Sequence, residues 1–321
     1  MVEHLLLQIA VNHYSEVSPD TWAKHLWVSE LARLEIHQPR PLIYQSSIAL
    51  RLARALRRSP QHIAQGIVEG QIPKQLAHRG DFRPSIGWLV PHILIAQQGE
   101  WIQVSLTASG VAQWLHTLTD GESANVLPLQ SCQKSTQKST EVDFRAIHAY
   151  ARCCSILRLS LEQGLIGQTD IPKMECSDVD AIVEASFAPK AGASPIPWLA
   201  GHRLRAIGEV HQMLLQTLIK TLDDVAKCAI KAGSRPDPLS LAYARGTSQI
   251  GRAFEAFHRE CRPLRNAGLT GWSGSGAIAS PQVASPQRVL EAQAELGLVR
   301  ATQQALGKLL TAAGIVPPPI L

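Results

Sequence analysis

The chain has few aromatic residues and lacks a long hydrophobic run. Phe, Trp and Tyr make up 5% of its 321 residues, although 45% of them are hydrophobic. Aliphatic side chains are therefore expected to fill the cores, as they do between packed helices. No stretch is long and apolar enough to cross a membrane, and no positively charged segment precedes Leu5–Leu7. These features predict a cytoplasmic protein that makes no contact with a membrane.

The cysteines form no recognisable metal or disulfide pattern. None belongs to a C-x-x-C pair, Cys153 and Cys154 are adjacent, and His258-x-x-Cys261 has no second pair of ligands. Structural zinc sites and disulfide frameworks both need such spacing. We expect reduced thiols, no metal and no cofactor. The six cysteines are Cys132, Cys153, Cys154, Cys176, Cys228 and Cys261.

Sequence motifs of common enzyme classes are also missing. There is no Walker A loop, no G-x-G-x-x-G, no G-x-S-x-G elbow and no H-E-x-x-H. We therefore assign no catalytic residue. The net charge is +5 and the isoelectric point about 9.0, which favours anionic partners.

Composition divides the chain into three parts. Residues 119–142 are polar and without periodicity, so they are expected to be a linker. Residues 1–118 combine helical and strand patterns, and residues 143–321 are mostly helical. The prediction is a mainly α protein, with a small α+β N-terminal domain joined by the linker to an all-α helical domain. In the second domain we expect helices near 143–163, 177–187, 199–232, 237–261 and 288–313, with a long loop at 266–287.

The first part carries a basic amphipathic helix, expected at residues 46–58. Arg51, Arg54 and Arg58 share one face of it, with Arg57 beside them. This face either contacts RNA phosphates or is a solvated basic surface. Ser59-Pro60 predicts the start of a helix that ends near Gly70. Residues 90–95 and 101–106 predict a β-hairpin, with Gln97-Gln98-Gly99 between the strands.

Three segments of the first part resemble the N-terminal additional domain of arginyl-tRNA synthetases. They are Tyr44 to Ala53, Ser59 to Ala64 and the run Gln98-Gly99-Glu100-Trp101-Ile102-Gln103. Leu42-Ile43 replace the Gly-Asp of that family's G-D-[YF]-Q stretch. The resemblance implies that Gln98, Trp101 and Gln103 contact the tRNA D-loop by stacking and base-edge hydrogen bonds. A half-buried strand with an exposed amide is the alternative.

Ile147 to Arg158 resembles the helix that opens the DALR anticodon-binding domain of the same family, with the pattern Q-Y-A-H-A-R-[ILV]-C-S-[IL]. The resemblance implies that His148, in place of the family's tyrosine, and Arg152 face the anticodon. The alternatives are a packing role for His148 and an interhelical ion pair for Arg152. Being four residues apart, the two side chains share one helix face.

The C-terminal part resembles the remainder of that domain. Leu215, Leu218 and Leu222 fit a long family helix, and Pro238-Leu239 to Leu264 follow the P-x-x-L-x-x-Y-L pattern and its continuation. The closing segment Leu309 to Pro317 precedes Leu321, which stands where the family has a terminal methionine that reaches the anticodon. Arg245, Arg252, Arg259 and Arg262 predict either a basic stripe or side chains that snorkel beside the core.

The catalytic domain of a class I synthetase is missing between these parts. The H-x-G-[HN] and K-M-S-K elements are absent, their nearest counterparts being Gly201-His202-Arg203 and Lys173 to Cys176. The 24 residues of 119–142 are too few, because one βαβ unit alone needs about 30. We expect a non-catalytic paralogue that binds tRNA, arginine-accepting by resemblance. A protein-interaction module that binds a full-length synthetase, and one part of a split arginine–tRNA ligase, stay as alternatives.

Overall fold

A computed structural model describes residues 32–33, 42–69, 92–119, 144–166, 196–205, 208–232, 237–261 and 285–317. The described residues are mostly helical and include a small sheet. The chain divides into two compact units, Met1–Val111 and Ala112–Leu321. Helix α6 (Ala108–Thr119) crosses this boundary. No helix in the described ranges combines the length and apolar character needed to cross a membrane.

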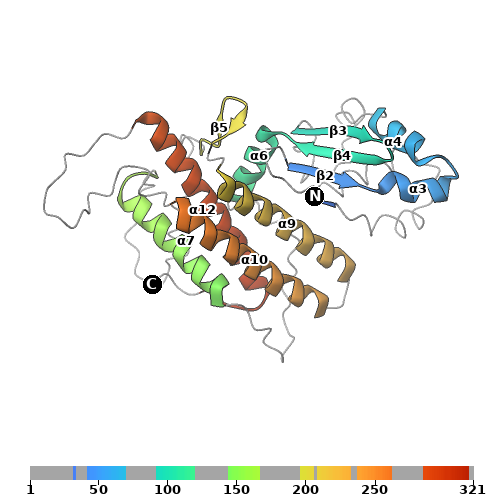
Figure 1. Ribbon diagram of the computed structural model, residues 1–321. Coiled ribbons are helices and arrows are strands. Elements are labelled where there is room, and N and C mark those ends of the chain that lie inside the picture. The colour runs from blue at the N-terminus through green and yellow to red at the C-terminus, as the bar shows by residue number, and fades with distance from the viewer. Residues whose placement is uncertain are drawn as a thin grey trace, which may run out of the picture. The chain divides into compact units, whose positions relative to one another are not determined.

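The first unit contains an antiparallel sheet of strand order β1-β2-β4-β3 (Figure 1). The hairpin β3–β4 turns at Gly99-Glu100, where Gly99 has φ +62°. The expected hairpin is confirmed, but its first strand lies three residues further along than 90–95. Gln97 and Gln98 are thus strand residues instead of turn residues. The strands are β1 (Ala32–Arg33), β2 (Leu42–Ser46), β3 (Ile93–Gln98) and β4 (Trp101–Leu106).

Two helices, α3 (Ile48–Leu56) and α4 (Pro60–Glu69), pack on each other and on the sheet. Their apolar residues bury one face of β4, formed by Ile102, Val104 and Leu106. The N-cap prediction at Ser59 is confirmed, because the His62 N–H donates to Ser59 Oγ at 3.1 Å. The expected helix 46–58 is shorter at both ends. Ser46 belongs to β2, and Arg57 takes a left-handed conformation with φ 51°.

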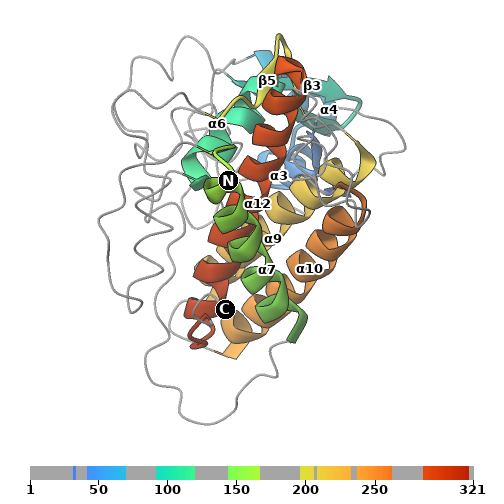
Figure 2. The same cartoon turned by 90° about the vertical axis from the view of Figure 1, so that its left-hand side faces the viewer.

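Four long helices form most of the described part of the second unit: α7 (Phe144–Glu162), α9 (Glu209–Ala232), α10 (Asp237–Cys261) and α12 (Pro286–Ala312). Helix α10 packs on the other three, and α12 packs on α7, α10 and α9 (Figure 2). Helix α12 is buried over most of its length from Ala292 to Leu310. A helix that is surrounded in this way lacks a polar face, and its apolar residues recur without amphipathic spacing.

The expected helices at 143–163, 237–261 and 288–313 are confirmed to within two residues at each end. The helix expected at 199–232 is wrong in its first part. Leu199–Ala200 (β5) and Arg203–Leu204 (β6) pair as a short hairpin, and the helix begins at Glu209. Gly201 causes this difference, because its φ of +62° makes a tight turn. The expected helix 177–187 and residues 120–142 lie outside the described residues.

Candidate nucleic-acid interface

Strand alternation places Trp101 and Gln103 on the face of β4 opposite the buried Ile102, Val104 and Leu106. Across the hairpin, Gln98 pairs in register with Trp101. On the other side of β4, Gln45 of β2 pairs with Gln103. The structure therefore brings all three predicted D-loop residues onto one face of the sheet. We call this surface, formed by Gln45, Leu94, Ala96, Gln98, Trp101, Gln103 and Ser105, the open sheet face.

Gln45 is a residue of this face to which sequence reasoning gave no role. Its Nε2 donates to Gln98 Oε1 at 3.5 Å, a contact between strands β2 and β3 across the intervening β4. The only sequence signal was its place after Tyr44 in the quoted stretch. Nothing in that stretch showed that β2 lies beside β4, because the register depends on the pairing of Gln45 with Gln103, which is far away in the sequence.

The open sheet face presents an indole among amide groups. Trp101 is 36% exposed and Leu94 is 64% exposed. An exposed indole offers a stacking surface to any base, and amides can donate to and accept from base edges. None of the seven residues of the face is charged. Attraction to phosphates must therefore come from residues outside it.

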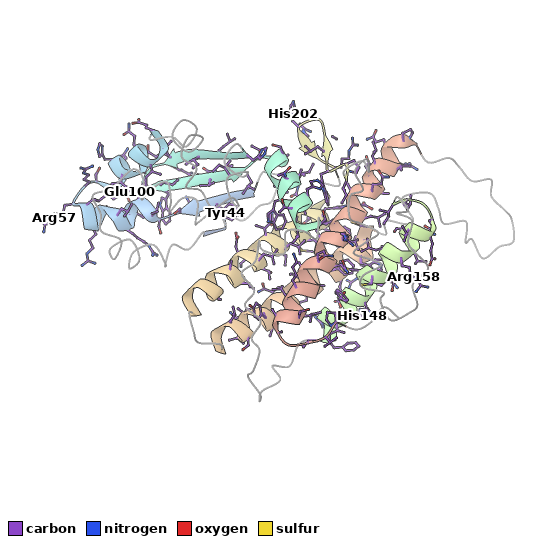
Figure 3. The ribbon with its side chains drawn as sticks, turned by 180° about the vertical axis from the view of Figure 1, so that it is seen from behind. Tyr44, Arg57, Glu100, His148, Arg158 and His202 are labelled. Carbon is purple, nitrogen blue, oxygen red and sulfur yellow. The ribbon has the colours of Figure 1, made fainter. Side chains whose placement is uncertain are left out.

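Four arginines of the first unit, Arg51, Arg54, Arg57 and Arg58, lie in α3 or directly after it. Arg54, Arg57 and Arg58 are exposed, whereas Arg51 is half-buried. The Arg57 and Arg58 N–H groups both donate to the Ala53 carbonyl oxygen, which closes the helix end. Figure 3 shows Arg57 at the tip of α3, pointing away from the sheet. Of the three arginines predicted to share one helix face, Arg54 and Arg58 are exposed and Arg51 is half-buried. Arg57 is the third exposed arginine.

An aromatic pair marks the start of α7. The rings of Phe144 and His148 are stacked, with centroids 6.4 Å apart and an interplanar angle of 27°. Both side chains are exposed, Phe144 by 76%. The opposite face of this helix is buried through Ala149, Tyr150 and Cys153. The predicted anticodon residue His148 is therefore on the surface (Figure 3). The neighbouring exposed ring of Phe144 is one to which sequence reasoning gave no role.

Arg152 lies one turn beyond His148 and contacts α10. Its Nε donates to His258 Nε2 at 3.3 Å. His258 must accept this hydrogen bond with a neutral ring, because a protonated imidazole has no free lone pair. Arg152 is itself exposed, so the guanidinium is oriented by α10 and still meets solvent. The alternative prediction for Arg152 was an ion pair between helices. The contact does join two helices, but the partner of Arg152 is a histidine.

Helices α7 and α10 approach closely near this contact. A Cβ added to Gly251 of α10 would meet the Cα of Ala146 of α7 at 3.4 Å. The arginines predicted to form a stripe on α10, Arg245, Arg252 and Arg259, are exposed, which is compatible with both a basic stripe and snorkelling side chains. Together the two helices carry six arginines and four acidic residues. Their surface is therefore only mildly basic. Arg262 lies outside the described residues.

His202, from the remote H-x-G-[HN] counterpart, sits in the turn of the β5–β6 hairpin and is exposed. That segment does not form a strand-to-helix junction of a nucleotide-binding domain. Leu321 and the segment from Lys173 to Cys176 lie outside the described residues. Comparison of the chain with protein-family models, curated proteins and solved structures found no match. The arginyl-tRNA synthetase resemblance therefore stays a prediction.

Proposed function

We propose that the chain is a cytoplasmic, non-catalytic RNA-binding protein related to arginyl-tRNA synthetases. In this proposal the first unit is an α+β domain that contacts the D-arm of a tRNA. The second unit is an anticodon-binding-type helical bundle, and the first candidate ligand is an arginine-accepting tRNA. The observation that supports the proposal best is the register of the sheet. It gathers Gln45, Gln98, Gln103 and an exposed Trp101 on one face.

The two kinds of residue in the first unit would contribute differently to binding. Arg54, Arg57 and Arg58 would neutralise phosphates, which provides affinity that is independent of sequence and decreases with salt. Trp101 and the three glutamines would contact unpaired bases, as single-stranded loops allow. With three phosphate contacts to single-stranded RNA, log affinity should fall with log salt concentration with a slope of about −2.

In the helical unit, the Phe144–His148 pair would stack on an unpaired base while Arg152 contacts a neighbouring phosphate. Because His258 already orients the Arg152 guanidinium, Arg152 would lose less side-chain entropy on binding. The replacement of the family's tyrosine by histidine is then accompanied by a second ring, Phe144. The stacking surface would thus be shared between two side chains one helical turn apart.

Fluorescence anisotropy with the intact chain tests the proposal. The probes are an arginine-accepting tRNA transcript and two labelled hairpins that correspond to its D-arm and anticodon arm, each at two salt concentrations. We expect binding of the transcript with a negative salt slope, and competition by both hairpins. Absence of binding even at low salt would overturn the proposal. Binding equal to that of a duplex RNA without loops would overturn the assignment of Trp101 and Phe144 to unpaired bases.

A second candidate function is docking of a protein on the open sheet face. Its lack of charge and the 64% exposure of Leu94 favour this alternative, because interface cores are depleted of charged residues. A pull-down with a purified full-length arginyl-tRNA synthetase after nuclease treatment separates the two functions. Capture that survives nuclease and is lost in Leu94→Asp supports docking. Capture that depends on RNA supports the first function.

A further inference from the structure

Three side chains from three different helices meet inside the second unit. His211 lies in the first turn of α9, Cys261 is the last residue of α10, and Glu295 lies in α12. His211 Nε2 is 3.1 Å from Glu295 Oε1, and Cys261 Sγ is 3.4 Å from His211 Nε2. One ligand atom of each residue lies within 4.8 Å of the other two.

The three side chains are ionisable although they lie in the interior of the helical unit. All three residues are buried, with exposures of 9% for His211 and 6% for Cys261 and Glu295. The ring of Phe257 meets the His211 ring edge to face at 5.3 Å. Burying a carboxylate, an imidazole and a thiol together costs free energy unless their charges and lone pairs are matched. The His211–Glu295 contact pairs the imidazole with the carboxylate, and the Cys261 thiol lies against the same imidazole.

The spacing fits a metal site. A tetrahedral zinc ion with ordinary bond lengths separates a nitrogen and an oxygen ligand by about 3.4 Å, and a nitrogen and a sulfur ligand by about 3.6 Å. The observed 3.1 and 3.4 Å are close to these values. The charges also fit, because a thiolate and a carboxylate together neutralise a divalent cation. Borderline-soft ions accept this mixture of nitrogen, sulfur and oxygen donors.

We propose that His211, Cys261 and Glu295 form a binding site for one divalent transition-metal ion of the zinc type, with water as the fourth ligand. This inference does not rest on the proposed RNA binding. The ion would join the beginning of α9, the end of α10 and the middle of α12. Its binding would stabilise the fold by the binding free energy, since the unfolded chain lacks the assembled ligands.

Metal binding requires one local rearrangement. Sγ of Cys261 is 3.4 Å from Nε2 and 3.6 Å from Nδ1 of His211. A sulfur almost equally distant from both ring nitrogens lies over the ring, and the lone pair of Nε2 points within the ring plane. A rotation of the imidazole ring or of the Cys261 side chain would therefore bring Nε2 and Sγ to a common ion. Such a rotation changes side-chain rotamers and leaves the helices in place.

Cobalt provides the decisive measurement, because Co²⁺ is coloured and usually replaces Zn²⁺. The full chain, reduced and freed of metal with a chelator, is titrated with Co²⁺ and then with Zn²⁺. We expect one equivalent of Co²⁺ to produce tetrahedral d–d bands and a thiolate-to-cobalt charge-transfer band. Zn²⁺ should abolish both bands and raise the midpoint of thermal unfolding. A wild-type chain that gives no stoichiometric charge-transfer band overturns the proposal.

Variants assign the signal to these residues. Cys261→Ala should lose the charge-transfer band, whereas the matched control Cys154→Ala, also a buried cysteine of this unit, should keep it. Glu295→Gln preserves side-chain size and a hydrogen-bonding oxygen for His211, and should weaken binding by more than about tenfold. It serves as the second test if circular dichroism shows that Cys261→Ala does not fold. A charge-transfer band that persists in folded Cys261→Ala, or a Co²⁺ dissociation constant in Glu295→Gln equal to that of the wild type, would place the metal elsewhere and overturn the proposal.

Discussion

Gln98 lies directly opposite Trp101 across the β3–β4 hairpin, and both side chains belong to the open sheet face. Their pairing depends on the two-residue turn at Gly99-Glu100. With a three-residue turn at Gln97-Gln98-Gly99, Gln98 would not belong to the strand at all. The turn thus determines whether an amide stands beside the indole. Any function of this face in RNA binding should be sensitive to Trp101 first.

Trp101→Ala should reduce the affinity of the chain for the D-arm hairpin by about 5- to 150-fold, because stacking of one base on an aromatic ring contributes roughly 1–3 kcal/mol. The free energy of unfolding should change little, since the side chain is among the exposed large hydrophobic residues. Fluorescence anisotropy and urea unfolding measure the two quantities. Trp101→Phe should recover most of the affinity, and the exposed Gln113→Ala on α6 serves as control. Equal affinity of Trp101→Ala and wild type would exclude stacking on this ring.

Arg57→Gly should stabilise the first unit while weakening its RNA binding. Arg57 is the only non-glycine residue in the described part of the chain with a positive φ. The left-handed conformation costs about 1–2 kcal/mol for a residue with a Cβ, and glycine avoids this cost. We expect urea unfolding to show a gain of up to about 1 kcal/mol, because glycine also loses more backbone entropy on folding.

Arg54→Gly is the matched control for this experiment. It removes the same charge from the same helix but places glycine at a helical position, which costs about 1 kcal/mol. Both variants should lower RNA affinity and reduce the salt slope by about one. Opposite effects on stability with similar effects on binding are the expected pattern. A loss of stability in Arg57→Gly would show that the left-handed residue is not strained.

The sequence predicted much of this structure because local signals are strong where helices begin and end. Ser59 caps α4 as expected, and α10 (Asp237–Cys261) has the expected bounds. The prediction failed where one glycine decided the geometry. Gly201 turned the start of a presumed helix into a hairpin, and Gly99 moved β3 by three residues. Both glycines use a positive φ that composition alone does not reveal.

The predicted site residues show a different limit. Trp101 and Gln103 were two residues apart, so strand alternation was enough to place them on one face. Gln45 and Gln98 are 53 residues apart, and His211 and Glu295 are 84 apart. Contacts of that kind depend on strand register and helix packing, so sequence spacing contains no signal for them. The search of the sequence for metal ligands did not single out His211, Cys261 and Glu295 for the same reason, because it considered only ligands close together in sequence.

Arg152→Gln should weaken binding of the anticodon-arm hairpin and make the salt slope less steep by about one. The reason is that its guanidinium is exposed and oriented by His258 Nε2 at 3.3 Å. Arg158→Gln makes the same change two turns further along α7, where the arginine pairs with Glu162 at 3.2 Å. It should leave both quantities almost unchanged. Equal losses in the two variants would mean that α7 attracts RNA by general charge alone.

The buried thiols predict how stability depends on pH in the alkaline range. Burial is the largest cause that raises the pKa of Cys153 well above its ordinary value of 9.0, and Cys154 adds to it. Burial also raises the pKa of Cys261 to about 12, with further contributions from Glu295 and Glu260. In the unfolded chain both thiols titrate near their ordinary value. Above about pH 9 the unfolded state therefore holds fewer protons than the folded state.

In the metal-free chain, this contribution to stability should accordingly be fully present below about pH 9 and decrease as the pH rises towards 12, by up to about 1.4 kcal/mol per pH unit for each thiol. Urea unfolding of wild type and Cys153→Ala across this range isolates one thiol, because the other titrating groups are common to both proteins. The variant should lose stability less steeply than the wild type. Cys228→Ala, which removes a half-buried thiol of α9, controls for the loss of a cysteine as such. Parallel curves for wild type and Cys153→Ala would show that the Cys153 thiol titrates alike in the folded and unfolded chain.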